Sequence, residues 1–88
     1  MISRTAVVGA SVGLHARPAA LFADAVDDSD LDVTISLNGK EADASSPLEI
    51  MTLGAKNGDT VTIATDDDSA ADKMDELAAM LERNLDAE

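Results

Sequence analysis

The 88-residue sequence contains no cysteine, tryptophan or tyrosine, and it has only one phenylalanine and one histidine. Without cysteine the chain can form no disulfide, carry out no thiol chemistry and build no thiolate metal site. One histidine among scattered acids shows no metal-ligand spacing, so we expect neither a metal ion nor any other cofactor. Because aromatic side chains are so rare, the core has to be built from Val, Ile, Leu, Met and Ala.

Basic residues are also scarce, with six lysines and arginines against 18 acids and a net charge of −12. This balance excludes a nucleic-acid-binding role, which requires a basic patch to neutralise phosphates. The first residues do not have the pattern of a signal peptide, and no apolar run approaches the length that crosses a membrane. We therefore expect a cytoplasmic protein that is not inserted in a membrane.

The excess of acids has two interpretations. One is an ordinary acidic protein with a well-solvated face. The other, which we favour, is a surface adapted to molar salt, as in halophilic archaea that accumulate salt. Repulsion among so many carboxylates opposes compaction in dilute buffer. At about 1 M salt the Debye length falls to roughly 3 Å, and much of this repulsion disappears.

Four segments alternate apolar and polar residues and are therefore predicted to be strands. They are residues 2–8, 31–37, 40–44 and 60–65. Asn38-Gly39 predicts a two-residue hairpin between the second and third strands, and Asn57-Gly58-Asp59 predicts a turn into the fourth. The third strand is short and carries three charges, which suits the edge of a sheet.

Helical spacing predicts a first helix from Ala16 to about Asp27, with a buried face that includes Phe22. Serines mark the predicted starts of two further helices. Ser46-Pro47-Leu48-Glu49 has the pattern of a capping box followed by a short helix that ends at Gly54. Ser69, with Asp72 three residues later, predicts the cap of the last helix. On that helix the buried stripe is expected to consist of Met74, Leu77, Ala78 and Leu81. The order β-α-β-β-α-β-α implies one sheet with helices on one face.

The segment Gly13–Pro18 is the main candidate for function. Gly13 permits a tight turn, and Pro18 suits the first turn of a helix, so His15 is predicted in a loop that leads into a helix N-terminus. The amides of Ala16 and Arg17 at such an end favour an anion, and the Arg17 guanidinium can bind phosphate with two hydrogen bonds. The alternative is that His15 only packs or caps and that Arg17 is a solvated charge. From these residues alone both remain open.

Gly13-Leu14-His15-Ala16-Arg17-Pro18-Ala19 resembles the active-site segment of HPr, the histidine phosphocarrier family of the sugar phosphotransferase system. Further segments fall where the HPr pattern has similar residues, without gaps between them. They are Asn38–Lys40, Ala44–Ser46, Met51–Gly54 and Asp59–Ile63. The resemblance spans essentially all 88 residues. It implies a single HPr-like domain over residues 1–88 and an α+β fold. That fold is an open-faced β-sandwich whose four-stranded antiparallel sheet is covered on one face by three helices.

The resemblance implies that His15 accepts a phosphoryl group on Nδ1 from phospho-enzyme I and passes it to an enzyme IIA domain. The protein would then be a phosphoryl carrier and not an enzyme, and we expect a monomer. A neutral imidazole is a competent nucleophile. The helix N-terminus at Ala16 and the charge of Arg17 both disfavour an imidazolium ion, and the same groups stabilise a phosphate attached to His15.

The resemblance also suggests two secondary sites. Ser46 matches a serine that a regulatory kinase phosphorylates in some bacteria; alternatively it is only a helix cap, and Asp43 and Glu49 would repel a phosphate there. Partner docking is implied for Ala20, Asp24, Asp27, Leu48 and Met51. Many bacterial HPr proteins have lysines at the positions of Asp24, Asp27 and Glu49, whereas all three are acidic here. Leu48 and Met51 would supply an apolar patch unless they face the core.

Two other functions would keep His15 unchanged. The chain would be either a regulatory HPr paralogue that no longer feeds sugar uptake, or a phosphoryl donor to a soluble kinase such as dihydroxyacetone kinase. A free-standing enzyme is disfavoured, because there is no phosphate-cradling glycine loop and no acid–base pair beside His15.

Overall fold

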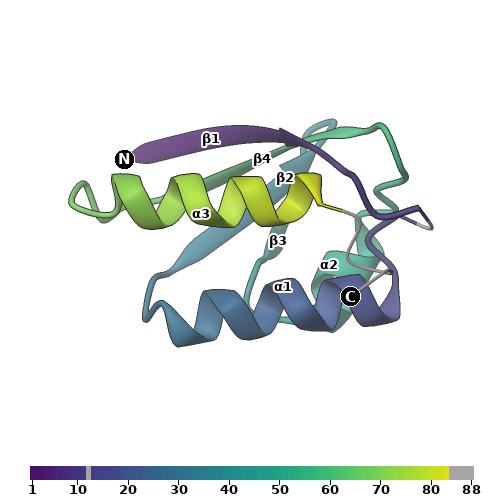
Figure 1. Cartoon of the computed structure of the whole chain (residues 1–88), viewed down its shortest axis with the longest axis horizontal. Helices are drawn as coiled ribbons and strands as arrows, with labels where there is room; N and C mark the ends of the chain where they lie inside the picture. The colour runs from purple at the N-terminus through teal and green to yellow at the C-terminus, as the bar shows by residue number, and fades with distance from the viewer. Residues whose placement is uncertain (12, 84–88) are drawn as a thin grey trace.

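The computed structural model describes residues 1–11 and 13–83. Its elements are β1 (Ile2–Val7), α1 (Ala16–Asp28), β2 (Val33–Leu37), β3 (Lys40–Asp43), α2 (Pro47–Thr52), β4 (Thr60–Thr65) and α3 (Ala71–Glu82). This is the predicted order (Figure 1). β4 has its predicted bounds, and the other three strands differ from theirs by one or two residues. The largest difference is at β2, because Asp30 adopts a φ of 59° and turns the chain before the strand begins.

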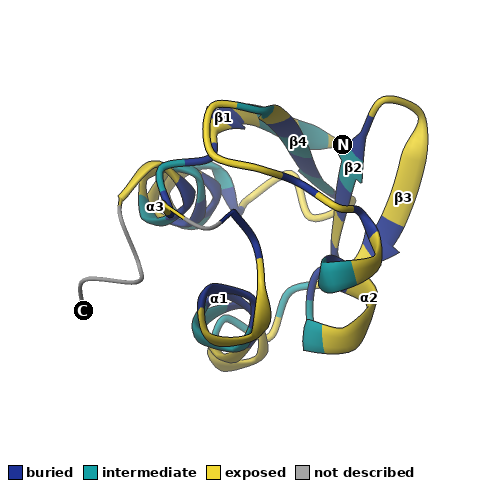
Figure 2. Ribbon diagram, turned by 90° about the vertical axis from the view of Figure 1, so that its right-hand side faces the viewer, coloured by how far each residue is buried: buried dark blue, intermediate teal, exposed yellow. Residues whose placement is uncertain are grey.

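The four strands form one sheet in the order β1-β4-β2-β3, and all neighbouring strands are antiparallel. The three helices lie on the same side of the sheet, and the other side is left open (Figure 2). The predicted open-faced sandwich is therefore confirmed. So is the edge position of β3, whose charged residues suggested it.

The core lies between the sheet and the helices and is almost entirely aliphatic. Phe22, the only aromatic residue, is fully buried on the inner face of α1. From the sheet it meets a layer that includes Ile35 and Ile63, and α3 contributes Met74, Leu77 and Leu81. Ala78, expected in that stripe, is only half-buried and packs at its border. Because the core is small, each of these side chains carries a large share of the burial that stabilises the fold.

The predicted capping box of α2 forms only by half. Ser46 caps the helix, and its Oγ accepts from the backbone N–H of Glu49 at 3.4 Å. The Glu49 carboxylate, however, accepts from the N–H of Asp43 at 3.3 Å, and the N–H of Ser46 donates to the Asp43 carbonyl. Asp43 lies on the edge strand β3, and its amide faces away from the sheet because the next amide, that of Ala44, bonds to Val33 of β2. Glu49 satisfies this amide, which a local pattern does not reveal.

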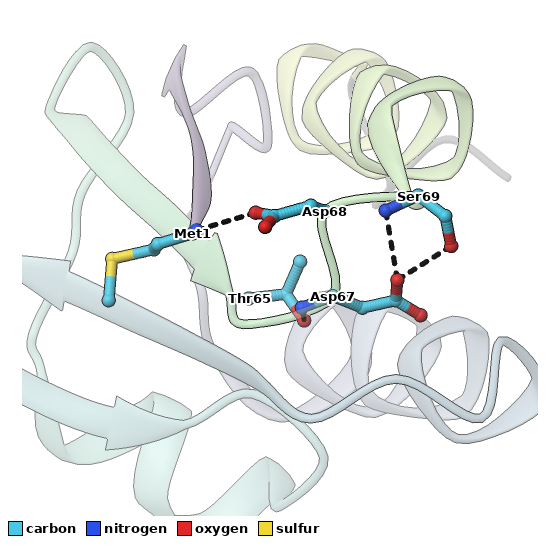
Figure 3. A network of polar contacts seen from close by, with 5 residues as sticks. All are labelled: Met1, Thr65, Asp67, Asp68 and Ser69. Carbon is cyan, nitrogen blue, oxygen red and sulfur yellow. Dashed lines mark hydrogen bonds and ion pairs between the residues drawn. The ribbon is translucent and has the colours of Figure 1, made fainter.

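The prediction that Ser69 caps the last helix is wrong. Helix α3 begins at Ala71, and Ala70 is its N-cap. Ser69 lies one residue too early and belongs to the preceding turn, where its N–H and hydroxyl both donate to Asp67 Oδ1 at 2.9 and 2.6 Å (Figure 3). The turn is also tied to the chain start, because the amino group of Met1 donates to Asp68 at 2.6 Å.

The end of β1 lies against the C-terminal end of α3. The N–H of Gly9 donates to the Leu81 carbonyl at 2.9 Å, and the Glu82 carboxylate accepts from the N–H of Val7 at 3.3 Å. A Cβ on Gly9 would overlap the carbonyl oxygen of Glu82. Glycine is therefore needed here for close approach of two backbones.

Replacing Gly9 by alanine should lower the free energy of unfolding by about 3 kcal/mol, because the new methyl group overlaps backbone that cannot move aside cheaply. The control is Gly39→Ala, where φ is +85° but no described atom lies within 4 Å of the added carbon. That change should cost only about 1 kcal/mol of local backbone strain. Urea unfolding of both variants measures the difference. An equal or smaller loss for Gly9→Ala would contradict the packing described here.

Ser69→Ala should raise the pKa of Asp67 towards the usual range for an aspartate. The Ser69 hydroxyl is the main cause that lowers this pKa, and its backbone N–H is the second. A depressed folded pKa adds stability above the unfolded pKa of about 4, and this contribution is lost as the pH falls through the folded value. The variant should therefore lose less stability on acidification. NMR titration of the carboxyl carbons measures the change. The pKa of Asp43 is the internal control, and it should not change because Ser45, not Ser69, lowers it.

Candidate functional site

His15 is the N-cap of α1. Its backbone is extended, with φ −95° and ψ −166°, and its carbonyl accepts the first helical hydrogen bond from the N–H of Ala19 at 2.9 Å. Within the described part of the chain its side chain makes no capping hydrogen bond, and the residue is exposed. The sequence placed His15 in the loop before the helix, whereas the structure makes it the capping residue itself. The imidazole is thus presented to solvent at the N-terminal end of α1.

The first turn of α1 lies beside His15. At the start of a helix the first backbone N–H groups have no carbonyl within the helix to bond to. Pro18 has no N–H, and the N–H of Ala19 already bonds to His15. This turn also contains no acidic residue. The positive end of the helix dipole therefore faces the surface beside His15 without an opposing charge on the turn.

Two buried residues fix this exposed segment on both sides. Leu14 is 3% exposed, and Pro18 is buried as part of the inner face of α1. Between them His15, Ala16 and Arg17 are all exposed. The predicted site thus consists of three exposed residues held between two core anchors, which limits how far its backbone can move.

The loop before His15 is bound to the segment that precedes β4. The N–H of Leu14 donates to the Ala55 carbonyl at 2.9 Å. Gly13 has a φ of +80°, and a Cβ there would overlap the same carbonyl oxygen. Its own N–H donates to Ala10, and its carbonyl accepts from the N–H of His15, both at 2.9 Å. Glycine is needed at position 13 for both its dihedral angle and its close contact.

Asn57 lies near this loop, although the sequence indicated it only as part of a turn. Its side-chain Nδ2 is 3.3 Å from the carbonyl oxygens of Gly9 and Ala10 and 3.5 Å from that of Val8. No pattern in the sequence links positions 57 and 8–10. Only the packing of the turn before β4 against the loop after β1 brings them together.

The residues predicted to dock partners lie on α1 and on the neighbouring α2. Ala20 is half-buried, and Asp24 and Asp27 are exposed at helical spacing from it, so an acidic stripe continues along α1 from the His15 end. On α2, which lies beside α1 (Figure 1), Leu48 is 70% exposed. Met51 is half-buried and packs against the core. Of the two apolar residues, only Leu48 is largely free to meet a partner.

Ser46 is half-buried, and its hydroxyl oxygen is engaged as the cap of α2. The expected acidic surroundings are present, because Glu49 and Asp43 are joined by a hydrogen bond beside it. Hydrogen bonds from the backbone and side chain of Ser45 lower the pKa of Asp43, which keeps this carboxylate ionised. A phosphate on Ser46 would thus meet negative charge.

Two further features of the described residues concern metals and membranes. Over residues 1–11 and 13–83, no group of three or more histidine, aspartate or glutamate side chains is arranged to hold a metal ion. In the same part of the chain, no helix combines the length and apolar composition needed to cross a membrane.

A family model described as "PTS HPr component phosphorylation site" matches residues 2–83. The phosphocarrier protein HPr of Vibrio cholerae is 35% identical over 83 residues, which cover 94% of this chain and 98% of that protein. The crystal structure of a phosphocarrier protein HPr from Bacillus anthracis has a TM-score of 0.83 and 34% identity, over 91% of this chain and 95% of that one.

A second solved structure is that of Crh, the Bacillus subtilis catabolite repression protein, described as a dimer with a swapping domain. It has a TM-score of 0.72 and 30% identity, over 94% of this chain and 98% of that one. The similarity thus runs through nearly the whole chain, in sequence and in structure alike. The protein belongs to the HPr family, the phosphocarriers of the phosphotransferase system.

Proposed function

We propose that His15 accepts a phosphoryl group from phospho-enzyme I in the cytoplasm and donates it to an enzyme IIA domain, so that the protein acts as a carrier and not as an enzyme. The observation that carries this proposal is the place of His15. The only imidazole of the chain is exposed at the N-cap of α1, beside the first-turn amides of Ala16 and Arg17.

The transfer needs little from the protein besides position and charge. The Nδ1 lone pair of a neutral imidazole attacks phosphorus, a P–N bond forms, and the bond between phosphorus and its donor atom on enzyme I breaks. The product carries a phosphate at the positive end of α1, an arrangement that contributes about 0.3–1 kcal/mol at an exposed site. Arg17 adds charge-assisted hydrogen bonds to the same oxygens. Because His15 is exposed, the phosphate remains accessible to a second acceptor.

Docking in this chain differs from the lysine-rich pattern of many bacterial relatives. Asp24 and Asp27 present negative charge on the exposed face of α1 beyond its first turn, so a partner that covers this face has to offer cations or bind where salt screens the repulsion. Leu48 supplies apolar surface at 70% exposure, next to α1. We propose that docking combines this side chain with such a complementary or screened surface.

Regulation through Ser46 and the role of a regulatory paralogue are less well supported. The Ser46 hydroxyl already caps α2, and the carboxylates of Asp43 and Glu49 lie nearby. For the whole chain, the similarity to Crh supports a regulatory role at 30% identity, slightly below the 34% for the phosphocarrier from Bacillus anthracis. We propose the carrier function, in a monomer.

We further propose that the acidic surface is an adaptation to concentrated salt. Among the described residues the acids are mostly exposed, whereas the buried positions are almost all apolar. The aliphatic core is small, and a typical domain has only about 5–15 kcal/mol of net stability. Charge repulsion on this scale therefore matters to whether the chain folds in dilute buffer.

His15→Ala should abolish phosphorylation that depends on phosphoenolpyruvate and enzyme I, because the only imidazole is removed. The fold should be unchanged, since His15 is exposed. Mass spectrometry of the intact protein measures the added phosphate. The control is Ser46→Ala, which removes the other candidate acceptor and should leave this phosphorylation intact. Undiminished acid-labile phosphate on His15→Ala would overturn the carrier mechanism.

The urea midpoint should rise with KCl and continue to rise well beyond 1 M. Screening supplies most of the gain below about 1 M. A further increase has to come from stronger apolar burial or from ions bound to the folded surface. In a control variant with Asp24, Asp27 and Asp28 changed to asparagine, the rise at low salt should be shallower. A midpoint that stayed constant from 0.1 to 3 M KCl would contradict a salt-adapted surface.

A further inference from the structure

We propose that Asn57 is a positioning residue for phosphoryl transfer, because its side-chain amide holds the loop that leads to His15. This inference rests on the proposed carrier function. Asn57 is exposed and distant in sequence from the site, yet its Nδ2 lies within 3.5 Å of three successive backbone carbonyls, those of Val8, Gly9 and Ala10.

Backbone hydrogen bonds connect the carbonyls at Asn57 to His15. The Ala10 carbonyl accepts from Asn57 Nδ2 and also from the N–H of Gly13. The Gly13 carbonyl in turn accepts from the N–H of His15 at 2.9 Å. The position of the His15 backbone therefore depends, through two hydrogen bonds, on the position of the carbonyl that Asn57 holds.

The turn that carries Asn57 is itself rigid. The N–H of Asp59 donates to the Lys56 carbonyl, and Asp59 Oδ2 accepts from the N–H of Lys56, both at 2.9 Å. Gly58 has a φ of +91°, and its N–H donates to the Val8 carbonyl at 2.9 Å. The N–H of Val8 donates back to the Asp59 carbonyl at 2.8 Å. Asn57 is thus presented to the loop from a fixed support.

The side chain at this position has to be a donor. Three carbonyl oxygens converge on it, and the asparagine amide offers two N–H groups that they share. Each contact is long, so none is strong by itself. Because Asn57 is exposed, water can replace the amide in a variant at little cost in stability. What water cannot replace is the common fixed point for three carbonyls. The expected loss is therefore in loop order, with little loss of folding.

Loop order matters for the transfer because phosphorus must approach Nδ1 of His15 in line with the bond that breaks. A misplacement of about 1 Å at a reacting group can cost on the order of 100-fold in rate. A loosened loop spends only part of its time misplaced, so we expect a loss of about tenfold. Partner binding should change little, because the predicted docking residues lie on α1 and α2 and not on this loop.

The test compares Asn57→Ala with Asn38→Ala and Asn57→Gln. Asn38 precedes a glycine in the β2–β3 turn with a φ of 52°, so its replacement makes the same chemical change in an Asn-Gly turn that is not bonded to the loop. Asn57→Gln keeps the amide donor and should restore function in part. Amide hydrogen exchange at Gly13 and His15 reports on the loop in the protein alone. Phosphorylation by phospho-enzyme I is measured as kcat and KM.

In Asn57→Ala we expect exchange at Gly13 and His15 to be about tenfold faster and kcat to fall about tenfold, with KM within twofold. Both readouts should stay near wild type in Asn38→Ala, even if that variant melts earlier. Unchanged amide exchange at Gly13 and His15 in Asn57→Ala would overturn the inference that Asn57 holds the loop, whatever the kinetics show. Faster exchange with an unchanged kcat would overturn the positioning role. If the wild type takes up no phosphate, the carrier function and the positioning role of Asn57 are both overturned. The exchange rates still decide whether Asn57 holds the loop.

Discussion

The site depends first on the burial of Leu14 and Pro18. These two residues insert into the core on either side of the exposed segment from His15 to Arg17. Without them, a loop with a helix end would present its imidazole in many orientations, and each productive encounter with a partner would pay for ordering it. With them, the order is already established by the hydrophobic effect, which would be insensitive to the charge of a phosphate on His15 if the proposed function holds. A carrier has to hold the same shape with and without phosphate, and anchoring through apolar side chains achieves this.

The sequence predicted the elements well where local physics determines them, and less well where distant segments meet. Alternation and helical spacing placed the strands and helices because burial on one face leaves a direct imprint on residue order. The Ser46 cap followed for the same reason, since a cap acts within its own turn. Ser69 misled because a serine before a helix also fits an Asx-type turn with Asp67, one residue away from the cap position. The site segment was predictable from residues 13–18, but its support by Ala55 and Asn57 was not. That support arises from the pairing of β1 with β4, which no local pattern encodes.

The distribution of acidic residues along α1 is uneven. None lies on the first turn, whereas Asp24 and Asp27 lie on the exposed face of the later turns. Under the proposed function, a phosphate on His15 would meet the positive helix end and Arg17, whereas a protein partner that spans more of α1 would meet negative charge. Phosphate stabilisation and partner docking would therefore depend on different parts of α1. Their salt dependence differs as well, since contact at a helix end acts over one turn, whereas repulsion between proteins acts over a Debye length.

Glu82 and Glu49 accept hydrogen bonds from the two edge strands of the sheet, and this bears on how copies of the chain meet in concentrated salt. Glu82 accepts a hydrogen bond from the outward-facing amide of Val7 on β1, and Glu49 accepts one from that of Asp43 on β3. Each of the two edges of the sheet therefore has one amide already occupied. In dilute solution a chain with this charge needs no such protection, because like copies repel. In concentrated electrolyte that repulsion vanishes, and strands with vacant amides become templates for one another. The hydrogen bonds of Glu82 and Glu49 do not depend on that repulsion, so under the proposed salt conditions these two edge amides would still be occupied.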